Sequence, residues 1–142
     1  MIVGYTTGVF DLFHIGHVNI LRNSRSLCDK LVVGVTVDEL VAYKGKRAVI
    51  SFADRIEVVR ACRYVDVAIP QLSIDKVEAV RKLGANRLFV GDDWYADPNW
   101  QKMEKELQTV GCGVIYFPYT HGTSSTLINQ TLQELRTNPS VG

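Results

Sequence analysis

The sequence has little of what marks an extracellular, membrane-inserted or nucleic-acid-binding chain. Its three cysteines, Cys28, Cys62 and Cys112, are odd in number and far apart, and none belongs to a CxxC pair. We expect them to be idle thiols in a reducing cytoplasm rather than parts of a disulfide framework. No run of about 18 apolar residues is present, so we expect no membrane insertion. The first seven residues lack the basic and apolar regions of a signal peptide.

An excess of charge of one sign is also missing. The 142 residues include 16 Lys and Arg against 15 Asp and Glu, for a net charge of +1. This balance argues against a strongly basic nucleic-acid binder. Hydrophobic residues make up 46% of the chain, which excludes intrinsic disorder for most of it. The length predicts one domain, which we place at residues 1–136, followed by a flexible tail at 137–142.

The overall balance hides a basic segment at residues 41–63. Its basic residues are Lys44, Lys46, Arg47, Arg55, Arg60 and Arg63, and its acidic residues are Asp54 and Glu57. Such a segment indicates either a solvated helix face or a site for a small polyanionic ligand. RNA binding has only this segment in its favour.

Short apolar runs alternate with helical patterns along the chain. Strands are expected at residues 2–6, 31–37, 65–69, 87–90 and 114–117, the third closed by Pro70. Helices are expected at residues 17–28, from an N-cap at Ser51, and at 74–83, 98–110 and 126–136. This alternation predicts an α/β fold with a parallel sheet covered on both faces. Ligands bind such sheets at the carboxyl ends of the strands, so the turns after strands one, four and five should share one rim.

The turn after the first strand carries the most distinctive pattern. Gly8 follows the strand, and His14 and His17 stand three residues apart where a helix begins. This spacing puts both imidazoles on one helix face near an N-terminus, which favours an anion. Gly16 lets the backbone approach a ligand closely. The alternatives are a structural pair or a zinc site, which needs a third ligand that the neighbouring sequence does not supply.

The last turn is rich in hydroxyl groups. It reads Tyr119-Thr-His-Gly-Thr-Ser-Ser-Thr126, a glycine followed by Ser and Thr at a predicted helix N-terminus. Such a turn suits the β- and γ-phosphates of a nucleotide, or else forms an ordinary helix cap. The candidate phosphate ligands here are Thr120, Gly122, Ser124, Ser125 and Thr126.

His14-Ile-Gly-His17, after a strand and a Phe-Asp pair, resembles the signature of the HxGH nucleotidyltransferase superfamily. The closer resemblance, over nearly the whole chain, is to the small bacterial cytidylyltransferases, especially those that use glycerol 3-phosphate. The matching segments are residues 8–17, Lys44-Gly-Lys46, Arg55, Arg63-Tyr-Val-Asp66 and Gly91-Asp-Asp-Trp94. The resemblance implies a Rossmann-like, doubly wound sheet of five parallel strands in the order 3-2-1-4-5, and a homodimer.

The implied reaction transfers CMP from CTP to a phosphorylated alcohol, glycerol 3-phosphate above all, and releases pyrophosphate. The attacking phosphate oxygen is already anionic at pH 7, so the reaction needs no general base or covalent nucleophile. Catalysis then comes from orientation and from neutralising charge on the phosphates. We expect Mg²⁺ to bind mainly through the CTP phosphates and water, without dedicated protein ligands.

Roles follow residue by residue from the resemblance. His14 and His17 are expected to donate to the phosphates around the reacting phosphorus, and Lys44 to close over the α-phosphate. Further expected nucleotide contacts are Thr7, Gly8, Val9, Phe10, Gly16, Lys46, Gly91, Asp92, Asp93 and Trp94, besides the hydroxyl-rich turn. The expected acceptor contacts are Asp11, Arg55 and Arg63. Lys44 and Lys46 could instead be solvated surface lysines, and Trp94 a core residue.

The hydroxyl-rich turn departs from the family pattern Arg-Thr-Glu-Gly-Ile-Ser-Thr-Thr. Tyr119 stands for the Arg and His121 for the Glu, so another cation, such as His121 or an Arg of a neighbouring subunit, would have to replace the lost one. Two other functions therefore stay open. One is cytidylyl or adenylyl transfer to a different acceptor, such as another phosphoalcohol, a sugar phosphate or FMN. The other is a nucleotide-binding sensor with weakened catalysis.

Overall fold

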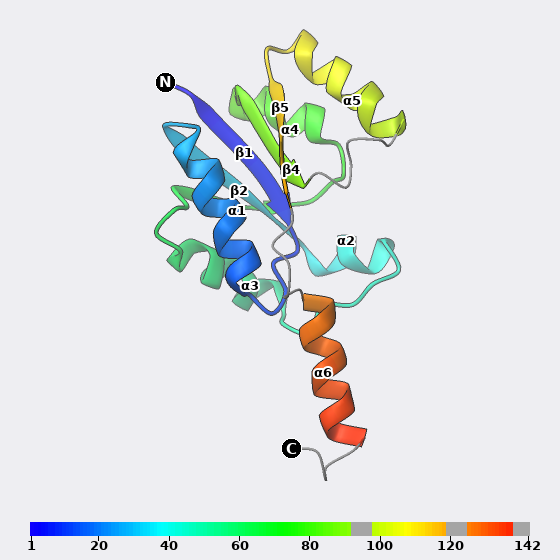
Figure 1. Cartoon of the computed structure of the whole chain (residues 1–142). Coiled ribbons are helices and arrows are strands. Elements are labelled where there is room, and N and C mark those ends of the chain that lie inside the picture. Colours follow the sequence, from blue (N-terminus) through cyan, green and yellow to red (C-terminus); the bar gives the residue numbers. More distant parts are fainter. Residues whose placement is uncertain (92–97, 119–124, 138–142) are drawn as a thin grey trace.

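A computed structural model describes residues 1–91, 98–118 and 125–137. One parallel sheet runs through it in the order β3-β2-β1-β4-β5, which confirms the predicted α/β fold (Figure 1). The strands are β1 (Val3–Gly8), β2 (Lys30–Thr36), β3 (Val67–Gln71), β4 (Arg87–Gly91) and β5 (Gly113–Phe117). The run of β-branched residues in β2 is buried on both faces, as a central parallel strand requires.

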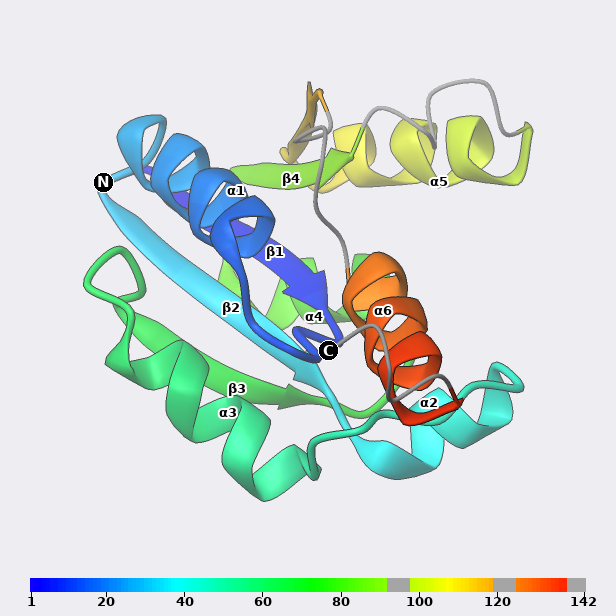
Figure 2. The same cartoon turned by 60° about the horizontal axis from the view of Figure 1, so that its bottom comes forward.

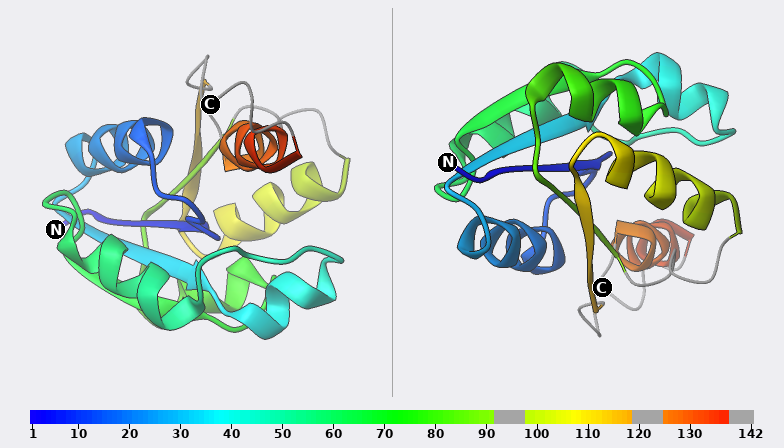
Figure 3. Two further views of the ribbon diagram at one scale, coloured as in Figure 1. Left: turned by 90° about the horizontal axis from the view of Figure 1, so that it is seen from below. Right: turned by 90° about the horizontal axis from the view of Figure 1, so that it is seen from above.

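Helices cover both faces of this sheet. On one face lie α1 (Ile15–Ser26) and α3 (Phe52–Ala61), which share one apolar cluster with Val33 of β2. On the other lie α4 (Lys76–Leu83) and α5 (Pro98–Thr109), which share a second cluster with Leu88 of β4. Figure 3 shows α1 and α5 on opposite sides of the sheet. Two apolar layers thus hold the strands rigid, so that their carboxyl ends form a fixed rim.

Two elements near this rim differ from the sequence prediction. A short helix, α2 (Asp38–Tyr43), follows β2 and was not expected, because six residues are too few to show a helical period. The third strand starts later than expected and continues through Pro70, which pairs with Val35. Proline has no N–H to donate, but β3 is an edge strand and tolerates the loss.

The helix starts are capped in different ways. Asp75 caps α4 as a side-chain acceptor, with Oδ1 at 3.1 Å from the N–H of Val77. Ser51 occupies the N-cap of α3 as predicted, yet its side chain makes no cap bond. The N–H of Phe52 donates instead to Asp38 Oδ2 at 3.1 Å. The start of α3 is therefore fastened to α2, beside the rim.

Both α2 and α6 (Ser125–Thr137) lie beyond the carboxyl ends of the strands, where α6 points away from the sheet (Figures 1 and 2). The last helix reaches one residue into the segment expected to be a tail, and residues 138–142 lie outside the described part. Within the described residues, no helix has both the length and the apolar character needed to cross a bilayer.

Candidate active site

The loop between β1 and α1 has an unusual backbone. Phe10 and Leu12 have φ angles of 54° and 48°, a region that side-chain-bearing residues rarely adopt. The Phe10 ring packs over Gly8 so closely that a Cβ atom there would lie 2.9 Å from Phe10 Cε2. Gly8 is therefore required by the close approach of the Phe10 side chain. Backbone strain of this kind concentrates at functional sites.

His14 and His17 cap the start of α1 reciprocally. Nδ1 of His14, the N-cap residue, accepts a hydrogen bond from the N–H of Gly16 at 3.0 Å. Nδ1 of His17 accepts one from the N–H of His14 at 3.1 Å. Because each Nδ1 is an acceptor, each neutral ring carries its proton on Nε2. The caps thus select the tautomer that presents an Nε2–H donor at the N-terminus of a helix.

Both imidazoles are held in the neutral form. Burial lowers the pKa of His14. Burial, and next the neighbouring His14, lower the pKa of His17 to about 4, although Asp11 opposes the shift. The two ring centroids are 4.0 Å apart, and His17 also stacks on Phe13 at 5.3 Å. Near neutral pH the pair therefore offers hydrogen-bond donors to an anion rather than full positive charges.

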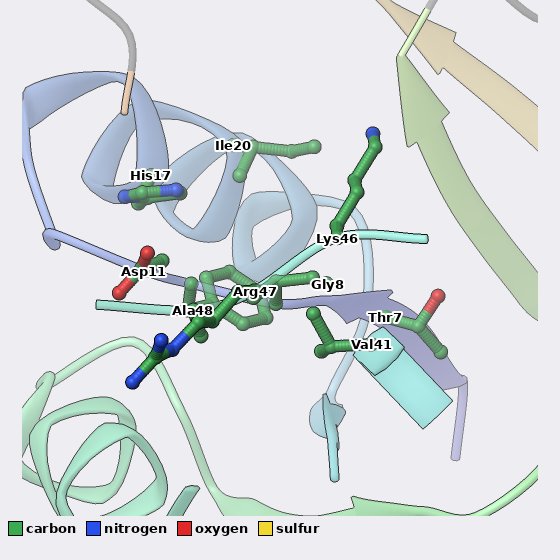
Figure 4. A pocket seen from close by; sticks show the side chains of 11 residues that line it. Thr7, Gly8, Asp11, His17, Ile20, Val41, Lys46, Arg47 and Ala48 are labelled. Carbon is green, nitrogen blue, oxygen red and sulfur yellow. The ribbon is translucent and has the colours of Figure 1, made fainter. Parts of the chain in front are cut away.

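Two cavities meet at the end of β1. The histidine cavity, of about 350 Å³, is lined among others by His17, Asp11 and Lys46. Figure 4 shows His17 and Asp11 on one side of it and Lys46 on the other. The lysine cavity, of about 420 Å³, is lined among others by Lys44 and Gly91. Both cavities include Thr7, Gly8, Val9 and Ile20, so one continuous surface connects them.

The loop of residues 44–51 follows α2 and is called the basic loop here. It borders both cavities. Lys44 is the C-cap residue of α2, and its pKa is lowered by burial and by the nearby charge of Lys46. The Asp11 carboxylate accepts from the N–H groups of Val49 at 2.8 Å and Ile50 at 2.9 Å. Asp11 therefore fastens the far end of the basic loop to the β1–α1 loop. Its expected acceptor contact stays a prediction.

Arg55 is only 1% exposed, and its place differs from the expected ligand contact. Its guanidinium donates to the carbonyls of Val9 at 2.7 Å, Thr36 at 2.8 Å and Ile50 at 2.9 Å. It also pairs with Asp38 at 2.7 Å. Arg55 thus ties β1, β2 and the basic loop together from below, and this geometry favours a positioning role over direct contact with a ligand.

Arg63 lies apart from both cavities in the single chain. Its Nη2 donates to the Tyr64 hydroxyl at 2.8 Å, and Arg22 Nε donates to the same oxygen at 3.2 Å. Neither the histidine cavity nor the lysine cavity is lined by Arg63. Its expected acceptor contact stays a prediction.

Several expected nucleotide contacts cannot be placed. Asp92, Asp93, Trp94, Thr120, Gly122 and Ser124 lie outside the described residues. Ser125 and Thr126 begin α6, but their side chains also lie outside the description. Of the expected turn after β4, only Gly91 is described, and it lines the lysine cavity.

Lys76 is a candidate that sequence reasoning missed. It begins α4 and lines the lysine cavity together with Lys44. Burial, and secondarily Lys44, lower its pKa to about 8. None of the ion pairs between described residues includes either lysine. The available signal was a lysine directly after the helix-capping Asp75, at the carboxyl end of the third strand and hence on the predicted rim.

Comparison with known proteins extends the match over the whole fold. Glycerol-3-phosphate cytidylyltransferase of Staphylococcus aureus is 33% identical over 128 residues, covering 89% of this chain and 92% of that protein. FAD synthase of Thermococcus sibiricus is 32% identical over 132 residues, covering 92% of this chain and 89% of that protein. A solved structure from Thermoplasma volcanium, described as a lipopolysaccharide core biosynthesis protein, aligns with a TM-score of 0.71 at 27% identity, covering 84% and 97% of the two chains.

The family model described as cytidylyltransferase-like matches residues 5–138, from the first strand to the end of the last helix. The matched region includes the reciprocally capped histidines and both cavities. The chain belongs to the cytidylyltransferase-like family.

Proposed function

We propose that this protein is an enzyme that transfers CMP from CTP to a small phosphorylated alcohol, glycerol 3-phosphate, giving CDP-glycerol and pyrophosphate. The observation that carries the proposal is the reciprocal cap of His14 and His17, which presents two neutral Nε2–H donors at the start of α1. The glycerol-3-phosphate cytidylyltransferase relatives support the choice of nucleotide and acceptor.

The chemistry needs donors and cations rather than a base. A phosphate oxygen of the acceptor attacks the α-phosphorus of CTP, and the bond from that phosphorus to the bridging oxygen breaks as pyrophosphate leaves. His14 and His17 would donate to phosphate oxygens that gain charge in the transition state. Removal of one such preorganised donor typically lowers the rate by about 10²–10³-fold.

The lysine cavity suits the acceptor. Lys44 and Lys76 place two cations there, and the buried Thr36 and Gln71 add a polar wall, with Thr36 Oγ1 donating to Gln71 Oε1 at 2.7 Å. In this arrangement Lys76 would neutralise the acceptor phosphate, and Lys44, which is expected to close over the α-phosphate of CTP, would border both groups.

Mg²⁺ is part of the proposal as the partner of the CTP phosphates. Asp11 lies beside His17 in the histidine cavity but directs both carboxylate oxygens to backbone N–H groups, at 2.8 and 2.9 Å. The proposal therefore gives Mg²⁺ its ligands from phosphate oxygens and water, and the ion would supply charge neutralisation on the leaving pyrophosphate.

The proposal also covers the cellular compartment, the oligomeric state and the use of the product. The described thiols of Cys28, Cys62 and Cys112 form no disulfide, which fits the cytoplasm. The proposal includes a homodimer with Arg63-Tyr-Val-Asp66 near its interface, as the family resemblance suggests. In this proposal the CDP-glycerol that the enzyme makes is used to build an envelope polymer such as teichoic acid.

Adenylyl transfer to FMN is the second candidate, because FAD synthases are also among the relatives. An acceptor screen separates the two: CTP or ATP is combined with glycerol 3-phosphate, other phosphoalcohols, sugar phosphates or FMN, and pyrophosphate release is followed. We expect turnover with CTP and glycerol 3-phosphate. Turnover with ATP and FMN alone would replace the proposal, and tight CTP binding without turnover on any acceptor would indicate a sensor.

A further inference from the structure

Lys76 needs a support that its own helix does not provide. It stands at the first position of α4, where the helix dipole is positive and disfavours a cation. The adjacent Asp75 uses Oδ1 to cap the helix, accepting from Val77 and Glu78 at 3.1 and 3.2 Å. Lys44 adds a second positive charge in the same cavity. A lysine with a flexible four-carbon stem would turn toward water under these conditions.

The indole of Trp100 supplies that support. The Lys76 ammonium nitrogen lies 5.2 Å from the centroid of the Trp100 ring, within the range of a cation–π interaction. Trp100 is buried at 6% exposure and lines the lysine cavity together with Lys76. The aromatic face attracts the ammonium without neutralising it, so its charge stays available to an anion.

The orientation of this indole is itself fixed by a hydrogen-bonded chain. Trp100 Nε1–H donates to the Tyr116 hydroxyl at 3.0 Å, and that hydroxyl donates to Glu104 Oε2 at 2.8 Å. Trp100 and Glu104 belong to α5, while Tyr116 belongs to β5, the edge strand next to β4. Residues from three elements, α4, α5 and β5, thus determine the position of the Lys76 ammonium group.

We propose that Trp100, oriented by Tyr116 and Glu104, is a positioning residue that holds the Lys76 ammonium inside the lysine cavity, where it meets the phosphate of the acceptor. This inference rests on the proposed function, because it concerns the acceptor end of that site. Trp100 acts through Lys76 and does not touch the reacting atoms. An interaction of this kind, once desolvated, changes affinity by about tenfold.

The kinetic test is a double-mutant cycle with Trp100→Leu, Lys76→Met and the double variant. We expect Trp100→Leu to raise the KM for glycerol 3-phosphate about tenfold and to leave the KM for CTP nearly unchanged. In the Lys76→Met background the same change should have little further effect on that KM, because its target is gone. Additive effects, or an equal loss for CTP, would show a structural role and overturn the inference.

Milder variants keep the test informative if Trp100→Leu fails to fold. Trp100→Phe keeps an aromatic face and should recover most of the acceptor affinity. Tyr116→Phe frees the indole N–H and Glu104 without removing the ring, and should raise the acceptor KM by a smaller factor. Two outcomes would exclude the positioning role: a Trp100→Phe variant that folds but loses the acceptor affinity, or a Tyr116→Phe variant that folds and binds the acceptor as the native enzyme does.

A spectroscopic arm works without turnover. The ring current of Trp100 should shift the Lys76 Hε protons upfield in the NMR spectrum, and Trp100→Leu should abolish that shift while Trp100→Phe reduces it. Added inorganic phosphate should move the Lys76 signals in the native protein. If no acceptor gives turnover, yet the ring-current shift and the phosphate response are present, the proposed function fails. The positioning of Lys76 by Trp100 is then still supported. If the active enzyme shows no ring-current shift, only the positioning of Lys76 by Trp100 is overturned, and the proposed function is not.

Discussion

Nδ1 of His17 accepts a hydrogen bond from the backbone N–H of His14 at 3.1 Å. His17 therefore fixes the N-cap residue of the helix to which it belongs. The same ring that stabilises the helix start therefore has its proton on Nε2, the atom that would face phosphate. Stability and proposed catalysis are coupled in one side chain, and substitutions can separate them.

His17→Asn and His17→Gln should separate the two roles. The Asn oxygen can replace Nδ1 as the cap acceptor, whereas the Gln amide can replace Nε2 as the donor. We expect His17→Asn to retain the melting temperature and lose about 10²–10³-fold in kcat. His17→Gln should keep more activity than His17→Asn. Equal activity of His17→Asn and the native enzyme would remove His17 from the catalytic assignment.

Acid should destabilise the fold through this same residue. The pKa of His17 is about 4 in the folded chain and near the ordinary 6.5 when unfolded. Between these values the unfolded chain binds a proton that the folded chain does not, so stability falls as pH decreases from 6.5 toward 4. Urea denaturation at pH 7 and pH 5 should show the loss, and His17→Asn should make it smaller. A pH-independent urea midpoint over that window would contradict the neutral, buried imidazole.

Arg55→Ala should act first on stability. It leaves the carbonyls of Val9, Thr36 and Ile50 without their donor and the Asp38 carboxylate without its partner, at a cost of about 3–5 kcal/mol. The matched control is Arg60→Ala on the exposed face of α3, which should cost less than about 1 kcal/mol. Denaturant unfolding compares the two. An unchanged stability of Arg55→Ala with a raised acceptor KM would restore the ligand contact expected from the sequence.

Gly8→Ala should disturb the histidine cavity, which Gly8 and Phe10 both line. The new methyl group would meet the Phe10 ring at 2.9 Å, so the ring or the strained loop must shift, at a cost of about 1–3 kcal/mol. Gly113→Ala, at the start of β5, meets nothing within 4 Å and serves as the control. We expect Gly8→Ala to weaken CTP binding in a direct titration, while Gly113→Ala binds normally. Normal CTP affinity in both variants would show that the Phe10 packing is independent of the site.

Local patterns explain what the sequence could predict. The β-branched run in β2 and the three-residue spacing of the histidines depend on neighbours in the chain, so both features were foreseeable. The order of the strands came from the family resemblance rather than from periodicity. Residues whose role depends on a side chain's neighbourhood could be assigned only through that resemblance.

Long-range contacts account for what was missed. The partners of Arg55 are the ends of β1 and β2 and Asp38, and no spacing rule brings them together. Lys76 and Trp100 likewise meet only because α4 and α5 pack on one face of the sheet. A basic residue in a sequence can equally be a surface charge, a buried tie or a ligand, and only its three-dimensional surroundings distinguish these.

Pro70 in the outermost strand has a consequence for self-association. An unprotected strand at the border of a sheet invites another chain to continue the ladder, and a residue without an amide hydrogen interrupts that continuation. A second copy of this protein would therefore not readily extend the sheet at β3. The same interruption guards this edge of the sheet against uncontrolled growth into fibrils.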